Sequence, residues 1–182
     1  MFCYICTKLS IRLDLLYSRR SIRKYTSQLI EPDKIEKLIE AALLSPTSRN
    51  REAWEFVIVT DKVALSKLGV SKPGSASMIS KAPLAIAVCG NPLISDVWVE
   101  DCSIAAIIIQ LAAHDMGLGS CWIQLRGRMY DEKESSCDYV KKTLDLPEHL
   151  EIECIISIGY PAEIKNKRDK NELSYNKVFR KA

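Results

Sequence analysis

Residues 97–116 read VWVEDCSIAAIIIQLAAHDM, and their Ala and Ile side chains recur around most of the circumference of a helix. A helix that is apolar on nearly every side must be covered on nearly every side. In a chain of 182 residues a second copy of the same chain is the expected cover. The segment therefore predicts a long helix in a homodimer interface, ended by Gly117.

Alternating strand and helix patterns lie on both sides of this helix. A helix is expected to begin at Pro32, because apolar residues follow it at steps of three and four up to about residue 45. Short runs rich in β-branched residues predict strands. The expected strands span residues 54–60, 83–89, 120–125 and 152–158, with a further helix over 132–144. The sequence therefore predicts one layered α/β domain of the α+β class over residues 1–182, with a loose N-terminus (1–10) and an extended C-terminal arm (about 162–182).

The composition narrows the possible functions. The net charge is only +3, which is unlike a nonspecific nucleic-acid binder, and no apolar run is long enough to span a membrane. The N-terminus lacks a secretory pattern and the seven cysteines are an odd, scattered set, so a soluble protein of the reducing cytoplasm is expected. Cys3 and Cys6 could form half a metal site or a redox pair, but two thiols near a loose terminus is the simpler interpretation, and no metal is predicted.

Three polar segments are candidates for a ligand site. Residues 19–25, RRSIRKY, offer three guanidiniums and a hydroxyl suited to a phosphate, although a solvated basic turn would look the same. Residues 45–54, SPTSRNREAW, could present hydroxyls and amides to a polar heterocycle or serve as helix-capping and turn residues. Residues 117–123, GLGSCWI, contain small residues that allow the backbone to approach a planar ligand closely.

These segments, together with IGYPAE at residues 158–163, resemble in their order the nitroreductase family of flavin enzymes. The resemblance extends from about residue 15 to residue 160. It implies a nitroreductase-like fold, in which helices flank a central mixed β-sheet. It also implies an intertwined homodimer, joined through the 97–116 helix and the C-terminal arm, that binds FMN at its interface.

The resemblance also implies which residues bind FMN. The phosphate and ribityl group would be held by Arg19, Arg20, Ser21 and Arg23. A further cation would follow residue 163, with Lys167 and Arg168 the first candidates and Lys165 and Lys170 also within reach. The loop residues Pro46, Thr47, Ser48 and Asn50 would reach the flavin of the partner or of the same subunit. The last group comprises Cys121, Trp122, Ile123, Gln124 and Leu125, with the backbone at Gln124 and Leu125 facing flavin N5.

Two departures from the family pattern concern this site. Several relatives have Gly where this chain has Gln124 and Leu125, and many have Gln and Pro before the Trp, where this chain has Glu52 and Ala53. The carboxylate of Glu52 would disfavour anionic substrates if it points inward.

The function implied by the resemblance is hydride transfer from NADH or NADPH, through flavin N5, to an electron-poor acceptor such as a nitroaromatic or a quinone, in a ping-pong cycle. No catalytic side chain is required. The acceptor pocket would be built from the loops at residues 66–80 and 125–136. Alternatives are a different reaction on the same FMN (enone reduction, dehalogenation or flavin consumption) and a basic module without enzymatic activity. His114, His149 and the Cys121 thiol have ordinary structural interpretations.

Overall fold

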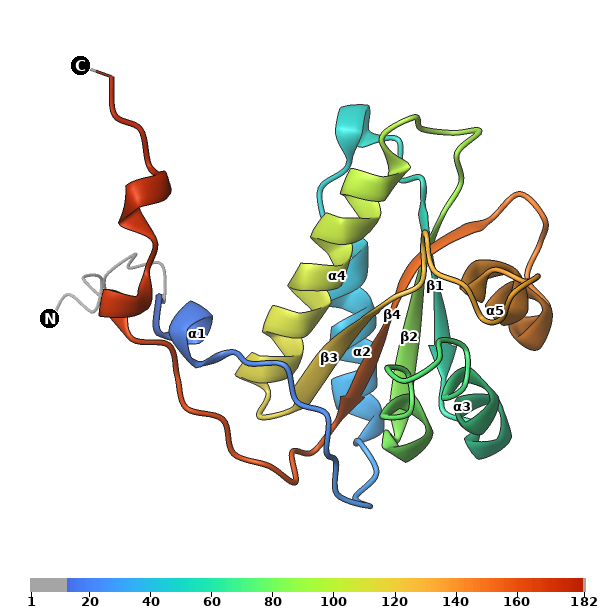
Figure 1. Cartoon of the computed structure of the whole chain (residues 1–182), viewed down its shortest axis with the longest axis horizontal. Helices are drawn as coiled ribbons and strands as arrows, with labels where there is room; N and C mark the ends of the chain where they lie inside the picture. The colour runs from blue at the N-terminus through green and yellow to red at the C-terminus, as the bar shows by residue number, and fades with distance from the viewer. Residues whose placement is uncertain (1–12, 182) are drawn as a thin grey trace, which may run out of the picture.

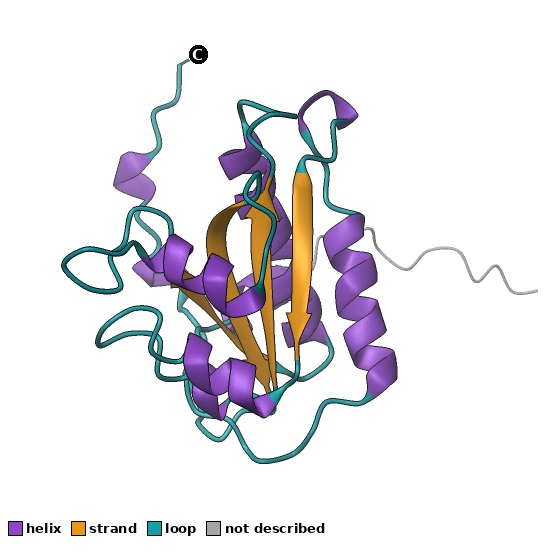
Figure 2. Ribbon diagram, turned by 90° about the vertical axis from the view of Figure 1, so that its right-hand side faces the viewer, coloured by secondary structure: helices purple, strands orange, loops and turns teal. Residues whose placement is uncertain are grey.

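Four strands form one sheet in the order β1-β2-β4-β3 in the computed structural model, which describes residues 13–181. The strands are β1 (Trp54–Val59), β2 (Leu84–Gly90), β3 (Gly119–Gln124) and β4 (Glu151–Gly159). All three pairings are antiparallel. The two central strands are almost wholly buried because helices cover both faces of the sheet (Figures 1 and 2).

The helices that cover the sheet differ in length and in how they begin. The α-helices are α1 (Leu13–Ser18), α2 (Pro32–Leu43), α3 (Lys62–Leu68), α4 (Trp98–Asp115) and α5 (Ser136–Leu144). The short 3-10 helices are η1 (Ser48–Asn50), η2 (Ile79–Lys81), η3 (Lys170–Glu172) and η4 (Tyr175–Lys177). Two helix starts are fixed by side chains that cap the first turn: Asp61 accepts from the backbone amide of Ala64, and Ser135 from that of Asp138.

The core has two parts, one on each face of the sheet. On one face α2 and α4 pack against alternate residues of the strands, such as Ile86 and Ile156. On the other face α3 and α5 pack against the intervening residues, such as Ala87 and Ile155. Figure 1 shows α4 lying along the sheet with α2 beside it, and α3 and α5 on the opposite side.

Helix α4 keeps part of its apolar surface uncovered by its own chain. Its residues Cys102, Ala105, Ala106 and Ile109 are buried against the sheet and α2. Ile104 and Ile107, on another side, each remain 39% exposed. The single chain therefore covers this helix only in part.

The polypeptide leaves the sheet after β4 and continues to residue 181 as an arm with little regular structure (Figure 1). Large apolar side chains on this arm are exposed, with Ile164 at 96% and Phe179 at 91%. Arg168 ties the arm back to the rest of the chain, because its amide donates to the carbonyl of Tyr17 at 2.9 Å. Cys3, Cys6 and the predicted loose N-terminus at residues 1–10 lie outside the described residues.

The α+β class is confirmed, and the long helix and the four strands lie within one or two residues of their predicted bounds. The prediction of a mixed sheet was wrong for the four strands, because all of their pairings are antiparallel. The parallel contact in the described chain is an isolated bridge between Ser21 and Ser120.

Two local predictions also need correction. The helix expected from residue 132 begins at Ser136, because the Asp131 carboxylate accepts from the amides of Lys133 and Glu134 and holds them in a turn. Helix α3 was not predicted, and its last residues overlap the loop expected at 66–80.

Candidate functional site

The basic segment 19–25 runs along the edge strand β3. The Ile22 amide donates to the carbonyl of Ser120 at 2.9 Å, and Ser21 forms the parallel bridge with Ser120. Gly119 permits this approach, since a Cβ there would lie 2.7 Å from the Ile22 side chain. Two of the three polar segments predicted from the sequence are therefore brought together.

The chain after β4 lies on the other side of the basic segment. The Ala162 amide donates to the carbonyl of Lys24 at 2.8 Å, and the Arg23 amide donates to Glu163 Oε1 at 2.6 Å. The Arg23 amide and the ammonium of Lys165, 3.0 Å from Glu163 Oε2, lower the pKa of the Glu163 carboxyl. Glu163 thus joins the IGYPAE segment to the basic segment.

Three guanidiniums gather where these segments meet. Burial, then the positive charges of Arg168 and Arg20, lower the pKa of Arg19, so both of these groups lie within electrostatic range of Arg19. The Arg20 guanidinium donates to the carbonyl of Asn166. In the part of the chain that the structure describes, none of the three forms a salt bridge with a carboxylate. Close cations without carboxylate partners form a site suited to a phosphate.

The three lysines considered after residue 163 do not join the three arginines. Lys165 pairs with Glu163, whereas Lys167 and Lys170 are exposed and line a shallow cavity of about 310 Å³ with Arg168, next to Tyr17 of α1. The structure thus places Arg168, among these four, within electrostatic range of Arg19.

Cys121 lies beside the basic segment but is unsuited to act as a nucleophile. The residue is 2% exposed. Burial raises the pKa of its thiol, and the nearby Arg23 guanidinium opposes this shift without reversing it. A thiol held protonated is a poor nucleophile, so Cys121 serves as a small buried side chain.

The end of β3 carries a hydrogen-bonded chain of side chains. The Trp122 indole Nε1 donates to Gln124 Oε1 at 2.9 Å, and Gln124 Nε2 donates to Glu153 Oε1 at 3.1 Å. Arg126 Nε lies 2.5 Å from Glu153 Oε2 and closes the chain. Ile123 and Leu125 point the other way and are buried in the core under α3 and α5, so only their main chain can face a ligand.

Sequence reasoning missed Glu153 and Arg126. A signal was present, because Glu153 is the one acidic residue inside the apolar run 152–158, IECIISI. A carboxylate in a buried strand requires a partner. Its partners come from another strand and could not be identified from the sequence.

The loop at residues 46–50 is held in an unusual conformation. Arg49, Asn50 and Glu52 have φ angles of 54°, 54° and 49°, each of which costs a non-glycine residue about 1 kcal/mol or more. The loop is fixed by the Ser48 amide, which donates to Asp101 Oδ1 at 2.9 Å, and by the Thr47 hydroxyl, which accepts from the Glu52 amide at 3.1 Å. Glu52 itself is exposed.

The structure does not bring this loop to the arginines of the same chain. Ser48 binds Asp101 in the first turn of α4, whereas Ser18, next to Arg19, lies 2.8 Å from His114 in the last turn. Asp101 and His114 are 13 positions apart, which corresponds to about 20 Å of helix. In Figure 1 the η1 segment lies at the upper end of α4 and the basic segment at the lower end.

The cavity at the lower end of α4 holds part of the predicted site. It has a volume of about 270 Å³. Its walls include Ser18, Arg20, His114, Gly119, Glu163 and Lys165. Burial, followed by the charge of Arg19, lowers the pKa of His114 and so disfavours its protonated form.

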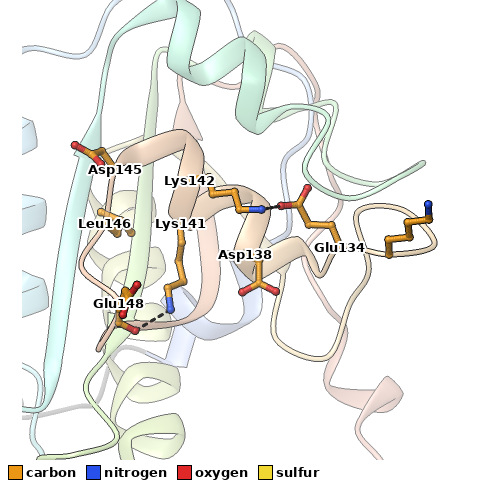
Figure 3. Close-up of a pocket in the computed structure, with 8 residues that line it drawn as sticks. Glu134, Asp138, Lys141, Lys142, Asp145, Leu146 and Glu148 are labelled. Carbon is orange, nitrogen blue, oxygen red and sulfur yellow. Dashed lines mark hydrogen bonds and ion pairs between the residues drawn. The ribbon is translucent and has the colours of Figure 1, made fainter.

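A larger cavity, of about 420 Å³, lies on α5, away from these residues. Figure 3 shows that both lysines of α5 are engaged within the protein: Lys142 meets the Glu134 carboxylate at 2.6 Å, and Lys141 donates to the main-chain carbonyl of Glu148 at 2.9 Å. None of the cofactor-binding residues predicted from the sequence lines this cavity, so it is not the candidate site.

Neither a membrane-spanning helix nor a metal-binding cluster is found among the described residues. No helix within 13–181 has the length and apolar character that a membrane crossing requires. Over the same range, no group of three or more His, Cys, Asp or Glu residues is arranged to hold a metal ion. His149 lies apart from the basic segment, 3.9 Å from Glu55.

Known proteins are similar to this chain in both sequence and fold. The family model described as "Nitroreductase family" matches residues 16–71 and 64–160. A putative NADH dehydrogenase/NAD(P)H nitroreductase of Archaeoglobus fulgidus is 35% identical over 158 residues, covering 85% of this chain and 87% of that protein. An FMN reductase (NADPH) of Bacillus subtilis is 25% identical, covering 86% of this chain and 68% of that protein.

Solved structures of other proteins have a similar fold. An FMN-dependent nitroreductase of Clostridium difficile R20291 superposes with a TM-score of 0.92 at 44% identity, covering 93% of this chain and 99% of that chain. A putative NADH dehydrogenase/NAD(P)H nitroreductase of Parabacteroides distasonis gives 0.84 at 34% identity, covering 93% and 97%. The four motifs, the sheet with its flanking helices and these matches lead to one conclusion: the chain belongs to the nitroreductase family.

Proposed function

We propose that this protein is an FMN-dependent oxidoreductase that uses NADH or NADPH to reduce an electron-poor acceptor, such as a nitroaromatic or a quinone. One observation carries the proposal: hydrogen bonds from Arg20 to the Asn166 carbonyl and from the Arg168 amide to the Tyr17 carbonyl join the basic segment to the arm, and Arg19, Arg20 and Arg168 have no carboxylate partners in the described chain. The printed names of similar proteins, which include an FMN-dependent nitroreductase and an FMN reductase (NADPH), support this assignment.

The residues present fit FMN. The arginine cluster provides forked donors for a phosphate, and Ser21 and Arg23 extend from it along β3 toward Cys121 and Trp122. The positive charge of this segment would also favour an anionic reduced cofactor. Bound FMN would supply the redox chemistry, accepting hydride at N5 from the nicotinamide and passing it to the acceptor in a ping-pong cycle.

The protein's own contribution is binding, orientation and the exclusion of water. The main chain at Gln124 and Leu125, at the end of β3, would form the wall beside flavin N5. No side chain is required to act as a nucleophile, which agrees with the buried, protonated state of Cys121.

The site requires a second copy of the chain. Pro46, Thr47, Ser48 and Asn50 lie at the opposite end of α4 from the arginines, so in this proposal they contact the FMN bound by the partner subunit. The exposed Ile104 and Ile107 on α4, and exposed apolar residues of the arm such as Phe179, would be covered in the same homodimer.

The proposal is tested by removing the flavin and restoring it. Protein stripped of flavin should oxidise neither NADH nor NADPH in the presence of a nitrobenzene or a benzoquinone, and added FMN should restore the reaction. Acceptor reduction that is unchanged by FMN removal, or absent after FMN is restored, would rule the proposal out.

A further inference from the structure

Strand β4 contains a bulge at Glu153. Val88 of β2 pairs with Cys154, but the next residue, Cys89, pairs with Ile152, so Glu153 is an extra residue with no partner on β2. A bulge of this kind redirects a side chain and bends the strand locally. Here it places a carboxylate that is only 3% exposed next to the end of β3.

The bulged residue holds the end of β3 through its main chain and its side chain. The Glu153 carbonyl accepts from the amides of Leu125 and Arg126, at 3.3 and 3.2 Å. One carboxylate oxygen accepts from Gln124 Nε2 and the other from Arg126 Nε. A buried carboxylate is tolerated because both of its oxygens have donors.

These contacts also fix the orientation of the Gln124 amide. Its nitrogen must face Glu153, because a carboxylate only accepts hydrogen bonds, so its oxygen is left to accept from the Trp122 indole. The amide nitrogen also lies 3.2 Å from the Arg126 carbonyl. The donors of Gln124 are therefore used within the protein and are not free for a ligand.

We propose that Glu153 is a positioning residue for the flavin site: through Gln124 and Arg126 it fixes the Trp122 indole and the main chain at 124–126. This inference rests on the proposed function, because residues 122–125 are the segment assigned to the flavin. Glu153 itself is separated from any ligand by the groups that it binds.

The variant Glu153→Gln tests the inference. A glutamine amide at 153 has one acceptor oxygen where the carboxylate has two, so an N–H group would replace the oxygen that faces Gln124 Nε2 or the one that faces Arg126 Nε. The Arg126 guanidinium only donates and takes the remaining oxygen, which leaves the N–H group facing Gln124; the Gln124 amide would then turn and the Trp122 N–H would lose its acceptor. We expect the Trp122 indole N–H resonance of the flavin-free protein to shift and the FMN dissociation constant to rise about tenfold. Glu151→Gln is the matched control, because Glu151 lies on the same strand and pairs with Lys141 at 3.3 Å, away from this network.

A reciprocal exchange provides a rescue experiment. In the double variant Glu153→Gln/Gln124→Glu, donor and acceptor change places, and the carboxylate at 124 can still accept from the Trp122 indole. We expect the indole resonance to return toward its original position and FMN affinity to recover to within about threefold of the unmodified protein. If Glu153→Gln does not fold, Gln124→Met removes the same link without altering the buried carboxylate and should give the same two changes.

The inference is overturned if a folded variant shifts the indole resonance while FMN affinity stays unchanged, or if the exchange restores neither quantity. Both results leave the proposed function intact, because the unmodified protein still binds FMN. An unmodified protein that binds no FMN would instead contradict the proposed function.

Discussion

At the scale of single residues, the proposed site depends on charges that lack carboxylate partners inside the described chain. Arg19, Arg20 and Arg168 repel one another, and the mutual repulsion contributes to the lowered pKa of Arg19. An arrangement that stores repulsion is relieved when an anion binds. The strength of FMN binding should therefore respond to each of these charges.

The first prediction concerns Arg168. Replacing Arg168 with Ala should weaken FMN binding by roughly tenfold to a hundredfold, since a hydrogen bond to a charged group contributes about 1.5 to 3 kcal/mol. Quenching of FMN fluorescence during titration of flavin-free protein measures the change. Lys62→Ala, which removes an exposed charge at the start of α3, serves as the control and should bind FMN normally.

A second prediction at this scale concerns Glu163 and pH. The pKa of the folded carboxyl lies below its ordinary value of 4.5, so Glu163 binds protons less readily when folded than when unfolded. Its contribution to stability is therefore present above pH 4.5 and is lost as the pH falls through the folded pKa.

Urea unfolding of the protein and of Glu163→Gln, followed from neutral pH to about pH 3, measures this contribution. The difference between the two free energies of unfolding should be greatest near neutral pH and should shrink on acidification. A difference that stays constant would show that the contacts with Arg23 and Lys165 do not favour the charged carboxylate.

At the scale of elements, the basic segment hydrogen-bonds to β3 at Ser120 and packs closely against it at Gly119. A methyl group at Gly119 would overlap the Ile22 side chain, including its Cβ at 2.8 Å, which cannot move without the backbone. We expect Gly119→Ala to lower the free energy of unfolding by about 1 to 3 kcal/mol, and to weaken FMN binding by displacing residues 19–23.

Denaturant unfolding and FMN titration measure both effects of Gly119→Ala. The double variant Gly119→Ala/Ile22→Ala removes the overlapping atoms, so part of the loss in FMN affinity should be recovered. Failure of the second substitution to recover any affinity would mean that the overlap with Ile22 is not the cause.

Elements were predictable from the sequence to different degrees. Helix α4 and the four strands follow from local patterns that persist in the fold, so their bounds were predicted closely. Helix α3 has seven residues and was missed, because so short a segment carries little periodic signal. The start of α5 was predicted too early, because the Asp131 side chain holds residues 133 and 134 in a turn and the helix begins only after it.

The candidate site was predictable only in part, for a related reason. The arginines and the β3 residues were identified from motifs, and they do lie together. The contact between Glu153 and Gln124 joins residues 29 positions apart across a bulge, and no local pattern encodes it. That the loop at 46–50 lies at the far end of α4 also became visible only in the folded chain.

At the scale of the whole molecule, the two parts of the proposed site lie at opposite ends of the longest helix of one chain, α4. A symmetric dimer would bring the loop of one copy to the arginines of the other. The partly exposed Ile104 and Ile107 provide the apolar surface that such an interface requires.

The dimer leads to a further prediction. Ile107→Asp places a charge in the proposed interface and should both dissociate the dimer and weaken FMN binding at least about tenfold. Sedimentation velocity and FMN titration measure the two effects. Val63→Asp on α3, on the opposite side of the sheet and 63% exposed, is the control and should change neither. A monomeric Ile107→Asp protein that binds FMN normally would contradict the shared site.

The most direct measurement is the visible absorption spectrum of the protein purified with FMN, recorded without oxygen before and after adding NADH and, separately, NADPH. We expect a flavin band that bleaches with at least one of the two nucleotides and returns when a quinone or a nitroaromatic is added. A protein that retains no flavin, or a flavin band that neither nucleotide bleaches, would contradict the assignment as an FMN-dependent NAD(P)H oxidoreductase.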